Sequence, residues 1–350
     1  MAREPSFESP TVAGNSARRA GARFRALMDL GRIQGISTTA AVAIVGALSS
    51  TRTPDIWAIV GLWLISVFAH TGGAAFNAIM ERRAPEAPCE QMRPARLHGM
   101  ITVAQAKLAT CGVIATALVL TYVLFGFAAY MAIVISGAWM LYYSWLARQR
   151  SPLYDIAFAV AYPVYGLFGS LAVGMPTQWT LLLMAVVSTV AVFSRWDNGR
   201  EYLDTDRRFG VPSFAVVWGL SMKLGVRARE PHYVHALALK CIFLAVVALP
   251  ILFMRLPFTY FLVVFGIGYP AQVYVMWRFL RKRSRLEYLK TILIDVPLSW
   301  VLGSAIVIPV AGMLAYFAMK IFVVTGYIAG TSLQSGAENR FARNAPVSHV

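Results

Sequence analysis

Charged residues are scarce in this chain, and their scarcity sets the fold class. Only 14% of its 350 residues are Asp, Glu, Lys or Arg, whereas 58% are hydrophobic. A soluble domain carries charge at about a quarter of its positions, so a soluble globular fold is excluded. The strict alternation of a membrane β-barrel is lacking as well. Apolar runs of about 20 residues or more are present instead, which is the length of a membrane-spanning helix, so the composition predicts an all-α polytopic membrane protein.

Acidic residues and cysteines are also few. The chain has 16 Asp and Glu against 32 Lys and Arg, a formal net charge of +16. The basic residues cluster in short connections between apolar runs, so we expect the lipid bilayer and not nucleic acid as the partner of this charge. The three cysteines, Cys89, Cys111 and Cys241, form no CxxC pair and no Cys/His cluster, and we expect free thiols.

The first residues lack the apolar segment of a signal peptide. Residues 1–29 are polar and rich in Arg, Ser and Pro, and are predicted to form a basic, disordered cytoplasmic tail. The membrane domain is expected over residues 30–328, and residues 329–350 are expected to form a flexible C-terminal tail.

Nine apolar segments are predicted to span the membrane. They cover residues 32–50, 55–80, 102–124, 127–147, 154–174, 178–200, 233–254, 257–279 and 292–326. The last segment is long, and we expect it to tilt or to break near Pro309. Prolines inside other spans are compatible with membrane helices when neighbours satisfy the freed backbone groups.

Lys and Arg are concentrated in the N-terminal tail and in every second connection. The connections after spans one, three, five and seven hold only Arg52 and Arg255 between them. By the positive-inside rule, the N-terminus and the basic connections are cytoplasmic, and we expect a multi-pass protein of the plasma membrane. Nine spans then place the C-terminal tail outside, although Arg340 and Arg343 in that tail favour the cytoplasm.

The first polar patch covers residues 77–99 and reads NAIMERRAPEAPCEQMRPARLHG. Asn77 and Glu81 stand four residues apart, so their side chains share one face of a helix. An amide oxygen beside a carboxylate suits a Mg²⁺ ion that is also bound by phosphates. The alternative is a polar cap at the membrane surface with a solvated Glu81.

The second polar patch covers residues 197–210 and reads DNGREYLDTDRRFG. Three carboxylates have the spacing of one helical face: Asp197, Glu201 and Asp204. Another acid and three bases with the fork geometry for phosphate oxygens complete the patch: Asp206, Arg200, Arg207 and Arg208. The alternative is a membrane exit whose acids and bases neutralise each other. Because both patches follow spans that end on one side, we expect them to share a pocket.

The first patch resembles a motif of the UbiA superfamily of intramembrane aromatic prenyltransferases. The family pattern is Asn-Asp-x-x-Asp-x-x-x-Asp followed by Arg-Pro and Gly. The matching residues here are Asn77, Glu81, Arg93-Pro94 and Gly99. Ala78 and Pro85 stand where the family has two of its acids.

Two further elements are similar to the same family, and the resemblance covers about residues 30–325. The second motif, Asn-Asp-x-x-Asp-x-x-x-Asp-Arg-x-x-Gly, is matched at Asn198, Asp206, Arg207 and Gly210. Tyr143-Ser144 with Arg148 is similar to the Tyr-Ser…Lys element of the family's fourth helix. Gly199 and Tyr202 replace two usual acids of the second motif.

The resemblance implies a Mg²⁺-dependent transfer of a prenyl group from a prenyl diphosphate to an aromatic, lipid or other small acceptor. Carried over to this chain, the catalytic residues are Asn77, Glu81 and Asp206. The implied metal ligands are Asn77, Glu81, Glu201, Asp204 and Asp206. The implied diphosphate-binding residues are Arg93, Arg200, Arg207, Tyr143 and Arg148.

Other functions remain open on the sequence. A terpene cyclase of the same fold would ionise a prenyl diphosphate and need no acceptor. A transporter would use charges inside its spans, for which Lys240, Asp295 and Lys320 are candidates. An inactive family member is a further alternative. His70 lies about two helical turns before Asn77 and could act as a base, but we favour an interior histidine with satisfied hydrogen bonds.

Overall fold

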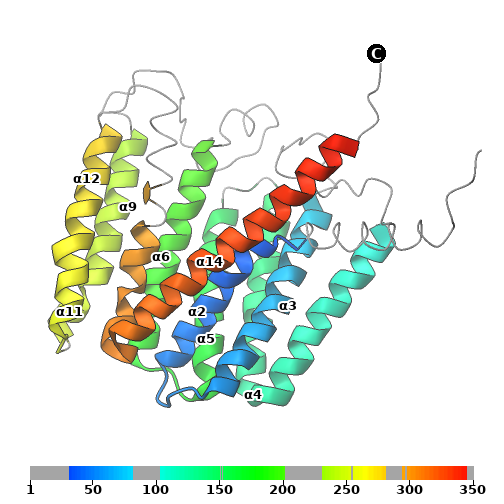
Figure 1. Ribbon diagram of the computed structural model, residues 1–350, viewed down its shortest axis with the longest axis horizontal. Helices are drawn as coiled ribbons and strands as arrows, with labels where there is room; N and C mark the ends of the chain where they lie inside the picture. Colours follow the sequence, from blue (N-terminus) through cyan, green and yellow to red (C-terminus); the bar gives the residue numbers. More distant parts are fainter. Residues whose placement is uncertain are drawn as a thin grey trace, which may run out of the picture.

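The computed structural model describes residues 31–81, 103–149, 151, 153–201, 231–253, 255–280, 294–295 and 298–344. In these ranges the chain is helical apart from short connections, and its helices form one bundle (Figure 1). Five described stretches are long and apolar enough to cross a membrane: Ile56–Met80, Ala104–Leu146, Ile156–Val173, Phe258–Arg278 and Leu298–Gly330. The predicted all-α membrane fold is therefore confirmed, whereas the count of nine spans stays a prediction.

The first half of the bundle is built from five helices. They are α2 (Ile36–Leu48), which follows the short turn η1 (Ile33–Gly35), and then α3 (Ile56–Glu81), α4 (Val103–Arg148), α5 (Tyr154–Val173) and α6 (Gln178–Glu201). The second half contains α9 (Pro231–Ala248), α10 (Pro250–Phe253), α11 (Phe258–Phe261), the π-helical η3 (Leu262–Gly268), α12 (Tyr269–Leu280), the short turn η4 (Ser304–Ile306) and α14 (Val307–Asn344).

Helix α4 is a hairpin of two helical limbs that reverses direction at Gly126. The backbone of Gly126 has φ 78° and ψ −171°, a conformation that only glycine adopts readily. The rings of Tyr122 and Tyr130 lie 5.8 Å apart, although eight residues of straight helix would separate them by about 12 Å. The first limb packs against α3, and the second packs antiparallel to α5, where Ser136 Oγ donates to Ala161 O at 2.9 Å. The reversal falls in the connection predicted between residues 124 and 127.

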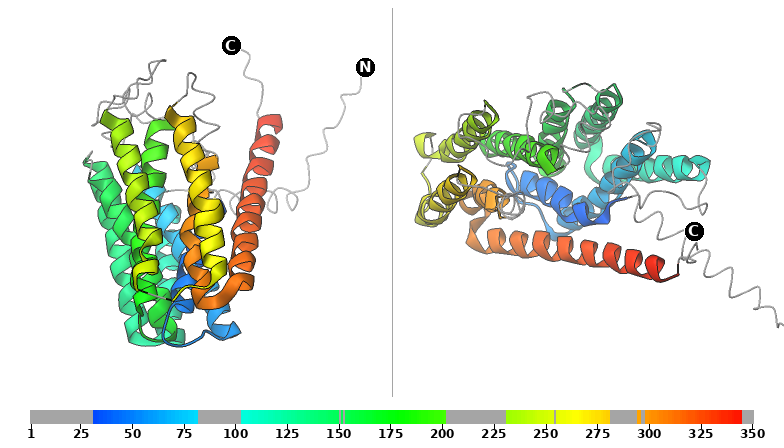
Figure 2. Two further views of the ribbon diagram at one scale, coloured as in Figure 1. Left: turned by 90° about the vertical axis from the view of Figure 1, so that its left-hand side faces the viewer. Right: turned by 90° about the horizontal axis from the view of Figure 1, so that it is seen from above.

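Helix α14 contains a second reversal, at Gly312, where φ is 83°. Beyond it, Tyr316 Oη donates to Val301 O at 3.0 Å and Lys320 Nζ donates to Trp300 O at 2.9 Å. The predicted last span, 292–326, therefore consists of two limbs that run in opposite directions, and the break comes three residues after Pro309. The returning limb runs along the side of α2 and ends at the same end of the bundle as α6 (Figures 1 and 2).

This reversal bears on two expectations about the C-terminus. Nine spans would leave the C-terminal tail at the opposite end of the bundle from the N-terminal tail. Instead, α14 returns to the end at which α3 and α6 finish (Figure 1). Residues 329–344, expected to belong to a flexible tail, continue the helix as far as Asn344.

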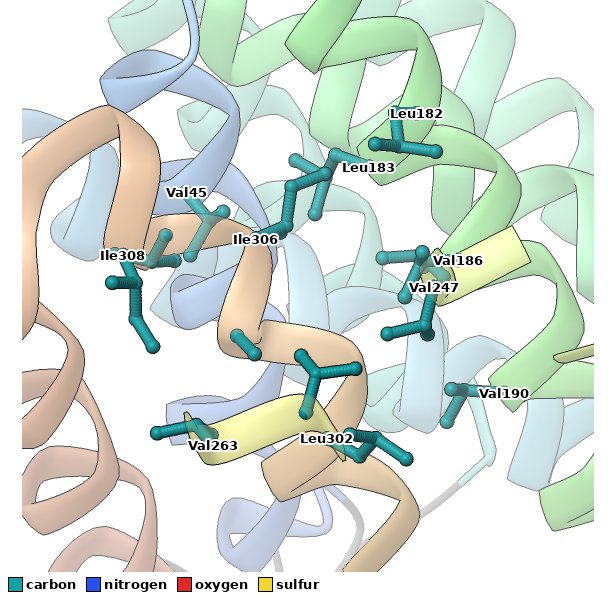
Figure 3. Close-up of a cluster of buried hydrophobic side chains, with 14 of the residues drawn as sticks. Val45, Leu182, Leu183, Val186, Val190, Val247, Val263, Leu302, Ile306 and Ile308 are labelled. Atoms are coloured by element: carbon teal, nitrogen blue, oxygen red, sulfur yellow. The ribbon is translucent and has the colours of Figure 1, made fainter. Parts of the chain in front are cut away.

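Close backbone contact between α2 and α5 holds the centre of the bundle together. A Cβ atom at Gly46 would lie 2.0 Å from Gly166 O, and one at Gly169 would lie 1.9 Å from Ala43 O. Such approaches are possible only where small residues meet, as is common between membrane helices. On either side of α2 lies a buried apolar cluster. One joins α2 to α3, α4 and α5, and the other joins α2 to α6, α9, η3 and residues 302–308 (Figure 3).

The connections α2–α3 and α5–α6 pair with each other at one end of the bundle. Ser50 and Pro176 form an antiparallel bridge, and Thr177 Oγ1 donates to Ser49 O at 2.5 Å. Helices α3 and α6 both start at these paired connections and have 26 and 24 residues. At about 1.5 Å per residue they reach nearly the same height. The two polar patches therefore follow helices that finish at the same end of the molecule.

Candidate active site

Asn77 is the best-defined residue of the first patch. It lies one turn before the end of α3, and its side chain is buried, with 7% of its surface exposed. Five residues earlier, Gly72 lets α4 approach, because a Cβ atom there would lie 2.6 Å from Ile114 Cγ1. On the second limb of α4, Ser144 Oγ donates to Asn77 Oδ1 at 3.1 Å. The α3–α4 contact thus forms one wall of the candidate site.

Glu81 is the last residue of α3 and follows Asn77 by one helical turn. This spacing places the two residues on one face of the helix, as predicted. The side chain of Glu81 lies outside the described part of the structure, and so does the whole of Arg93. Their roles as metal ligand and diphosphate ligand stay predictions.

Tyr143 stands next to Ser144 on α4, but its ring packs against α5. The ring is 6% exposed, and its centroid lies 5.8 Å from that of Tyr154 and 5.5 Å from that of Phe158. Phe158 in turn packs on Tyr162, with centroids 4.9 Å apart. These residues form an aromatic row that extends along α5. The assignment of Tyr143 to the diphosphate stays a prediction, as does that of Arg148, whose side chain is not described.

The second patch begins within the last turns of α6. The backbone is described up to Glu201, which is the last residue of the helix, but the side chains from residue 193 onward are not. Several predicted residues lie wholly outside the described ranges: Asp204, Asp206, Arg207 and Arg208. Arg200 and Glu201 are placed by their backbone at the end of the bundle shared with α3. The predicted pocket between the two patches therefore remains a prediction.

The chemistry of the first patch fits Mg²⁺. The amide oxygen of Asn77 and the carboxylate of Glu81 are hard oxygen ligands, which this ion prefers over nitrogen and sulfur. Among the described side chains, no group of three or more His, Cys, Asp or Glu residues is placed to hold a metal ion. Cys111 and Cys241 are free, as predicted, and Cys89 lies outside the described residues.

His70 is an interior histidine whose two ring nitrogens both have protein partners. Its Nε2 lies 3.0 Å from Arg32 O, and its Nδ1 lies 2.8 Å from Thr39 Oγ1. The ring sits directly against Gly35, where a Cβ atom would come within 2.5 Å of it. These contacts agree with the structural role favoured for His70 and tie η1 and α2 to α3.

The charges that suggested a transporter are held by the protein itself. Lys240 Nζ donates to Asp295 Oδ1 at 2.5 Å and to Ser299 Oγ at 2.9 Å, and Gln272 Nε2 donates to Ser299 Oγ at 3.1 Å. All four side chains are buried. We call these four residues the Lys240 cluster. Lys320 donates to Trp300 O and lies over the Tyr316 ring.

The contact between Ser144 and Asn77 is the feature that the sequence did not predict. Ser144 belongs to the Tyr-Ser pair, but no role was assigned to it. The two residues are 67 positions apart, and only the packing of α4 against α3 brings them together. The periodicity of either helix alone contains no signal for that pairing.

Comparison with known proteins identifies the family to which this sequence is similar. The family model of the UbiA prenyltransferase family matches residues 36–294. Among curated protein sequences, none matches the chain significantly. The matched region contains α2 to α12, including both polar patches, but stops before most of the C-terminal hairpin.

Solved structures share the fold at low sequence identity. A structure of digeranylgeranylglyceryl phosphate synthase has a TM-score of 0.63 at 17% identity, covering 83% of this chain and 99% of its own. A UbiA homologue from Archaeoglobus fulgidus, bound to GPP and Mg²⁺, has a TM-score of 0.58 at 16% identity, covering 81% and 99%. A UbiA homologue from Aeropyrum pernix K1 has a TM-score of 0.53 at 16% identity, covering 87% and 98%. The chain belongs to the UbiA prenyltransferase family.

Proposed function

We propose that this chain is a Mg²⁺-dependent intramembrane prenyltransferase that moves a prenyl group from a prenyl diphosphate to a small aromatic or lipid acceptor. The observation that supports it best is the position of Asn77. This first residue of a family motif is buried at the end of α3, and α6 carries the second motif to the same end of the bundle. Family membership supplies the reaction class, and the homologue bound to GPP and Mg²⁺ supplies a precedent for the ligands.

The proposed reaction is a substitution at the first carbon of the prenyl chain. The bond between this carbon and the diphosphate oxygen breaks, and its electron pair leaves with the diphosphate. The allylic carbon then bonds to a carbon or oxygen atom of the acceptor, which gives up one proton to solvent. Bound Mg²⁺ supplies positive charge to the leaving diphosphate. We assign its binding to Asn77, Glu81 and Asp206, with Glu201 and Asp204 as further ligands.

Basic and aromatic side chains complete the proposed site. Guanidinium groups neutralise the diphosphate through paired N–H donors, and we assign this role to Arg93, Arg200, Arg207 and Arg148 with the hydroxyl of Tyr143. Phe158 and Tyr162 form an aromatic row that begins beside Tyr143. Tyr143 directly precedes Ser144 in the sequence. The faces of such rings stabilise an allylic cation and exclude water from it.

The site is proposed to face the cytoplasm of a plasma-membrane protein. The basic connections 82–102, 202–230 and 281–293 adjoin α3, α6, α9 and α12 at the end of the bundle where Asn77 lies. By the positive-inside rule, this end is the cytoplasmic one.

The function is tested by incubating membranes that contain the protein with geranyl, farnesyl or geranylgeranyl diphosphate and Mg²⁺, first without an acceptor and then with hydroxybenzoate-like or quinolone acceptors. Prenylated acceptor and inorganic diphosphate are expected only when both substrates are present. Membranes from cells that lack the protein provide the control. Unchanged prenyl diphosphate under every condition would contradict the proposal.

Terpene cyclisation is the second candidate, and two features favour it. Ala78 and Pro85 replace acids of the family motif, and the aromatic row of α5 could wrap a folding cation. A cyclase would release diphosphate without an acceptor. A cyclic hydrocarbon or alcohol in the acceptor-free incubation would therefore replace the transferase assignment with this one.

A further inference from the structure

Gly73 faces open space on the inner side of α3. A Cβ atom built at Gly73 would meet no atom of the described residues within 4 Å. Leu62, Ser66 and Asn77 lie on the same face of the helix, eleven and seven residues before the glycine and four residues after it. All three are buried: Leu62 and Ser66 have no exposed surface, and Asn77 has 7%. Gly73 therefore faces the interior of the bundle, and we call the room in front of it the Gly73 space.

Two glycines of α4 show how this position differs from a lipid-facing one. A Cβ atom at Gly112 or Gly137 would likewise meet no described atom within 4 Å. Both of these glycines are exposed, however, whereas Gly73 is partly buried. An exposed position on a membrane-spanning helix contacts lipid tails. The Gly73 space lies inside the bundle, where enclosed room next to a polar site is suited to the apolar part of a ligand.

A layer of hydrogen-bonded side chains from three helices lies below the Gly73 space, on the side away from the polar patches. His70 of α3 is one turn below the glycine, and its Nδ1 lies 2.8 Å from Thr39 Oγ1 of α2. Thr39 Oγ1 lies 3.4 Å from Tyr162 Oη of α5. One turn further down, Tyr165 Oη of α5 donates to Ser66 Oγ of α3 at 2.9 Å. These contacts join α2, α3 and α5, and they form a floor under the space.

The aromatic row runs from the first polar patch to this floor. It begins at Tyr143, whose neighbour Ser144 donates to Asn77. It continues through Phe158 and ends at Tyr162, which belongs to the floor itself. The row thus covers the same height as the Gly73 space, and its rings offer apolar surface to a hydrocarbon chain.

The height of the Gly73 space matches a short prenyl chain. Asn77 and His70 are seven residues apart on α3, which corresponds to about 10 Å along the helix axis. An extended geranyl chain has a similar length, whereas farnesyl and geranylgeranyl chains are longer by one and two isoprene units. We infer that the site selects a prenyl diphosphate with two isoprene units, whose chain lies against Gly73 and ends at His70 and Tyr162. The inference rests on the proposed function, because it takes Asn77 as the diphosphate end of the site.

The test compares kcat/KM of the purified full-length protein for dimethylallyl, geranyl, farnesyl and geranylgeranyl diphosphate, each with Mg²⁺ and the same aromatic acceptor. We expect geranyl diphosphate to be the best substrate. Farnesyl and geranylgeranyl diphosphate should be at least about 10-fold poorer, because a chain that is too long overpacks the space.

Filling the Gly73 space should weaken the use of the geranyl chain. In Gly73→Leu, kcat/KM for geranyl diphosphate should fall at least about 10-fold, and that for dimethylallyl diphosphate should fall less, because its chain is shorter. Gly112→Leu is the matched control, since it adds the same side chain to an exposed glycine and should keep the wild-type preference. Gly73→Ala should act in the same direction as Gly73→Leu, and it carries the test if the thermal unfolding midpoint shows that Gly73→Leu is not folded.

Opening the floor should have the opposite effect. Tyr162→Ala removes the ring, so the ratio of kcat/KM for farnesyl to that for geranyl diphosphate should rise at least about 10-fold. Tyr162→Phe keeps the ring and loses only the contact of the hydroxyl with Thr39, so the preference for geranyl diphosphate should remain.

The contradicting outcomes separate this inference from the proposed function. If the wild type uses geranylgeranyl diphosphate as well as geranyl diphosphate, or if a folded Gly73→Leu protein keeps the wild-type kcat/KM for geranyl diphosphate, the chain does not occupy the Gly73 space, and the proposed function is unaffected. If Gly73→Leu raises only the KM for the acceptor, the space holds the acceptor and not the prenyl chain. If the wild type consumes none of the four diphosphates, the proposed function and the assignment of the chain both fall.

Discussion

Two buried polar groups in this bundle differ in whether they contain a pair of opposite charges. In the Lys240 cluster, α9, α12 and residues 295–299 supply an ammonium, a carboxylate, an amide and a hydroxyl that bind one another. At Asn77, a neutral amide meets the hydroxyl of Ser144, one turn before Glu81 at the end of α3. The cluster carries its own counter-charge, whereas we propose that the patch after Asn77 binds a metal and a diphosphate from outside the chain. A buried charge whose counter-charge lies in the same bundle is therefore explained without a ligand.

The largest expected effect is at the patch that begins with Asn77. Glu81→Ala and Asp206→Ala should each reduce diphosphate release by more than about 100-fold, since losing a metal ligand should cost more than losing a residue that only orients one. The measurement is release of inorganic diphosphate from geranyl diphosphate in the presence of Mg²⁺ and an aromatic acceptor. Asp55→Asn, at the opposite end of the bundle, is the control, because its carboxylate caps the start of α3 by accepting from Ala58 N at 2.7 Å. Retained activity in both variants would remove these residues from the metal site.

Substitutions in the Lys240 cluster should change the stability of the protein and not its catalytic activity. Asp295→Ala leaves Lys240 buried without its carboxylate, and breaking such a pair costs about 3–5 kcal/mol. The thermal unfolding midpoint in detergent should fall, while activity per folded molecule persists. The double variant Lys240→Met/Asp295→Leu should recover most of the lost stability, because apolar side chains can replace a buried pair. If a folded Asp295→Ala protein lost its activity, the Lys240 cluster would have a role in catalysis and not only in stability.

A smaller effect is expected from packing alone. In Gly169→Ala the new Cβ would lie 1.9 Å from the backbone oxygen of Ala43, so α2 and α5 must separate. Overpacking of this kind costs about 1–3 kcal/mol, visible as a lower unfolding midpoint. Gly112→Ala on α4 is the matched control, since nothing lies within 4 Å of its added methyl group. Equal midpoints for the two variants would show that the α2–α5 contact is looser than the structure indicates.

The smallest effect is expected at Lys320. Its ammonium donates to Trp300 O, but this carbonyl also accepts from Ser304 Oγ at 2.6 Å. Lys320→Met therefore leaves no acceptor without a donor, and it removes a charge that has no acidic partner among the described side chains. The unfolding midpoint should change by the equivalent of about 1 kcal/mol or less, the net worth of one hydrogen bond. A loss as large as that of Asp295→Ala would mean that charge itself, paired or not, supports this part of the bundle.

The fold class followed from the sequence because it depends on local properties. Long apolar runs and basic connections reveal membrane helices without knowledge of their neighbours, and the α4 reversal at Gly126 lies between two predicted spans. For residues 292–326 a tilt or a break near Pro309 was predicted, but a reversal of the chain was not, because apolar residues continue on both sides of Gly312. There, the packing of residues 313–326 back onto residues 300 and 301 and onto α2 overrides the continuous apolar pattern.

The contacts that build the site depend on pairing between distant segments. The motif spacing identified Asn77 and Glu81 as one helical face, which the structure retains. It could not show that Ser144 meets Asn77 or that Lys240 meets Asp295, since these partners are 67 and 55 residues apart. Lys240 and Asp295 were considered as separate transport residues for this reason. Lys240 and Asp295 form an ion pair only because the bundle brings their two segments side by side.

The most direct test of the proposed diphosphate site is a stoichiometric assay of the purified protein with geranyl diphosphate, Mg²⁺ and an aromatic acceptor. Release of inorganic diphosphate should match the prenylated acceptor one for one and stop when EDTA removes the metal. The same assay on Glu81→Ala should show neither product. Diphosphate release that continues in EDTA, or that persists in Glu81→Ala at the wild-type rate, would contradict a metal-dependent diphosphate site at the end of α3.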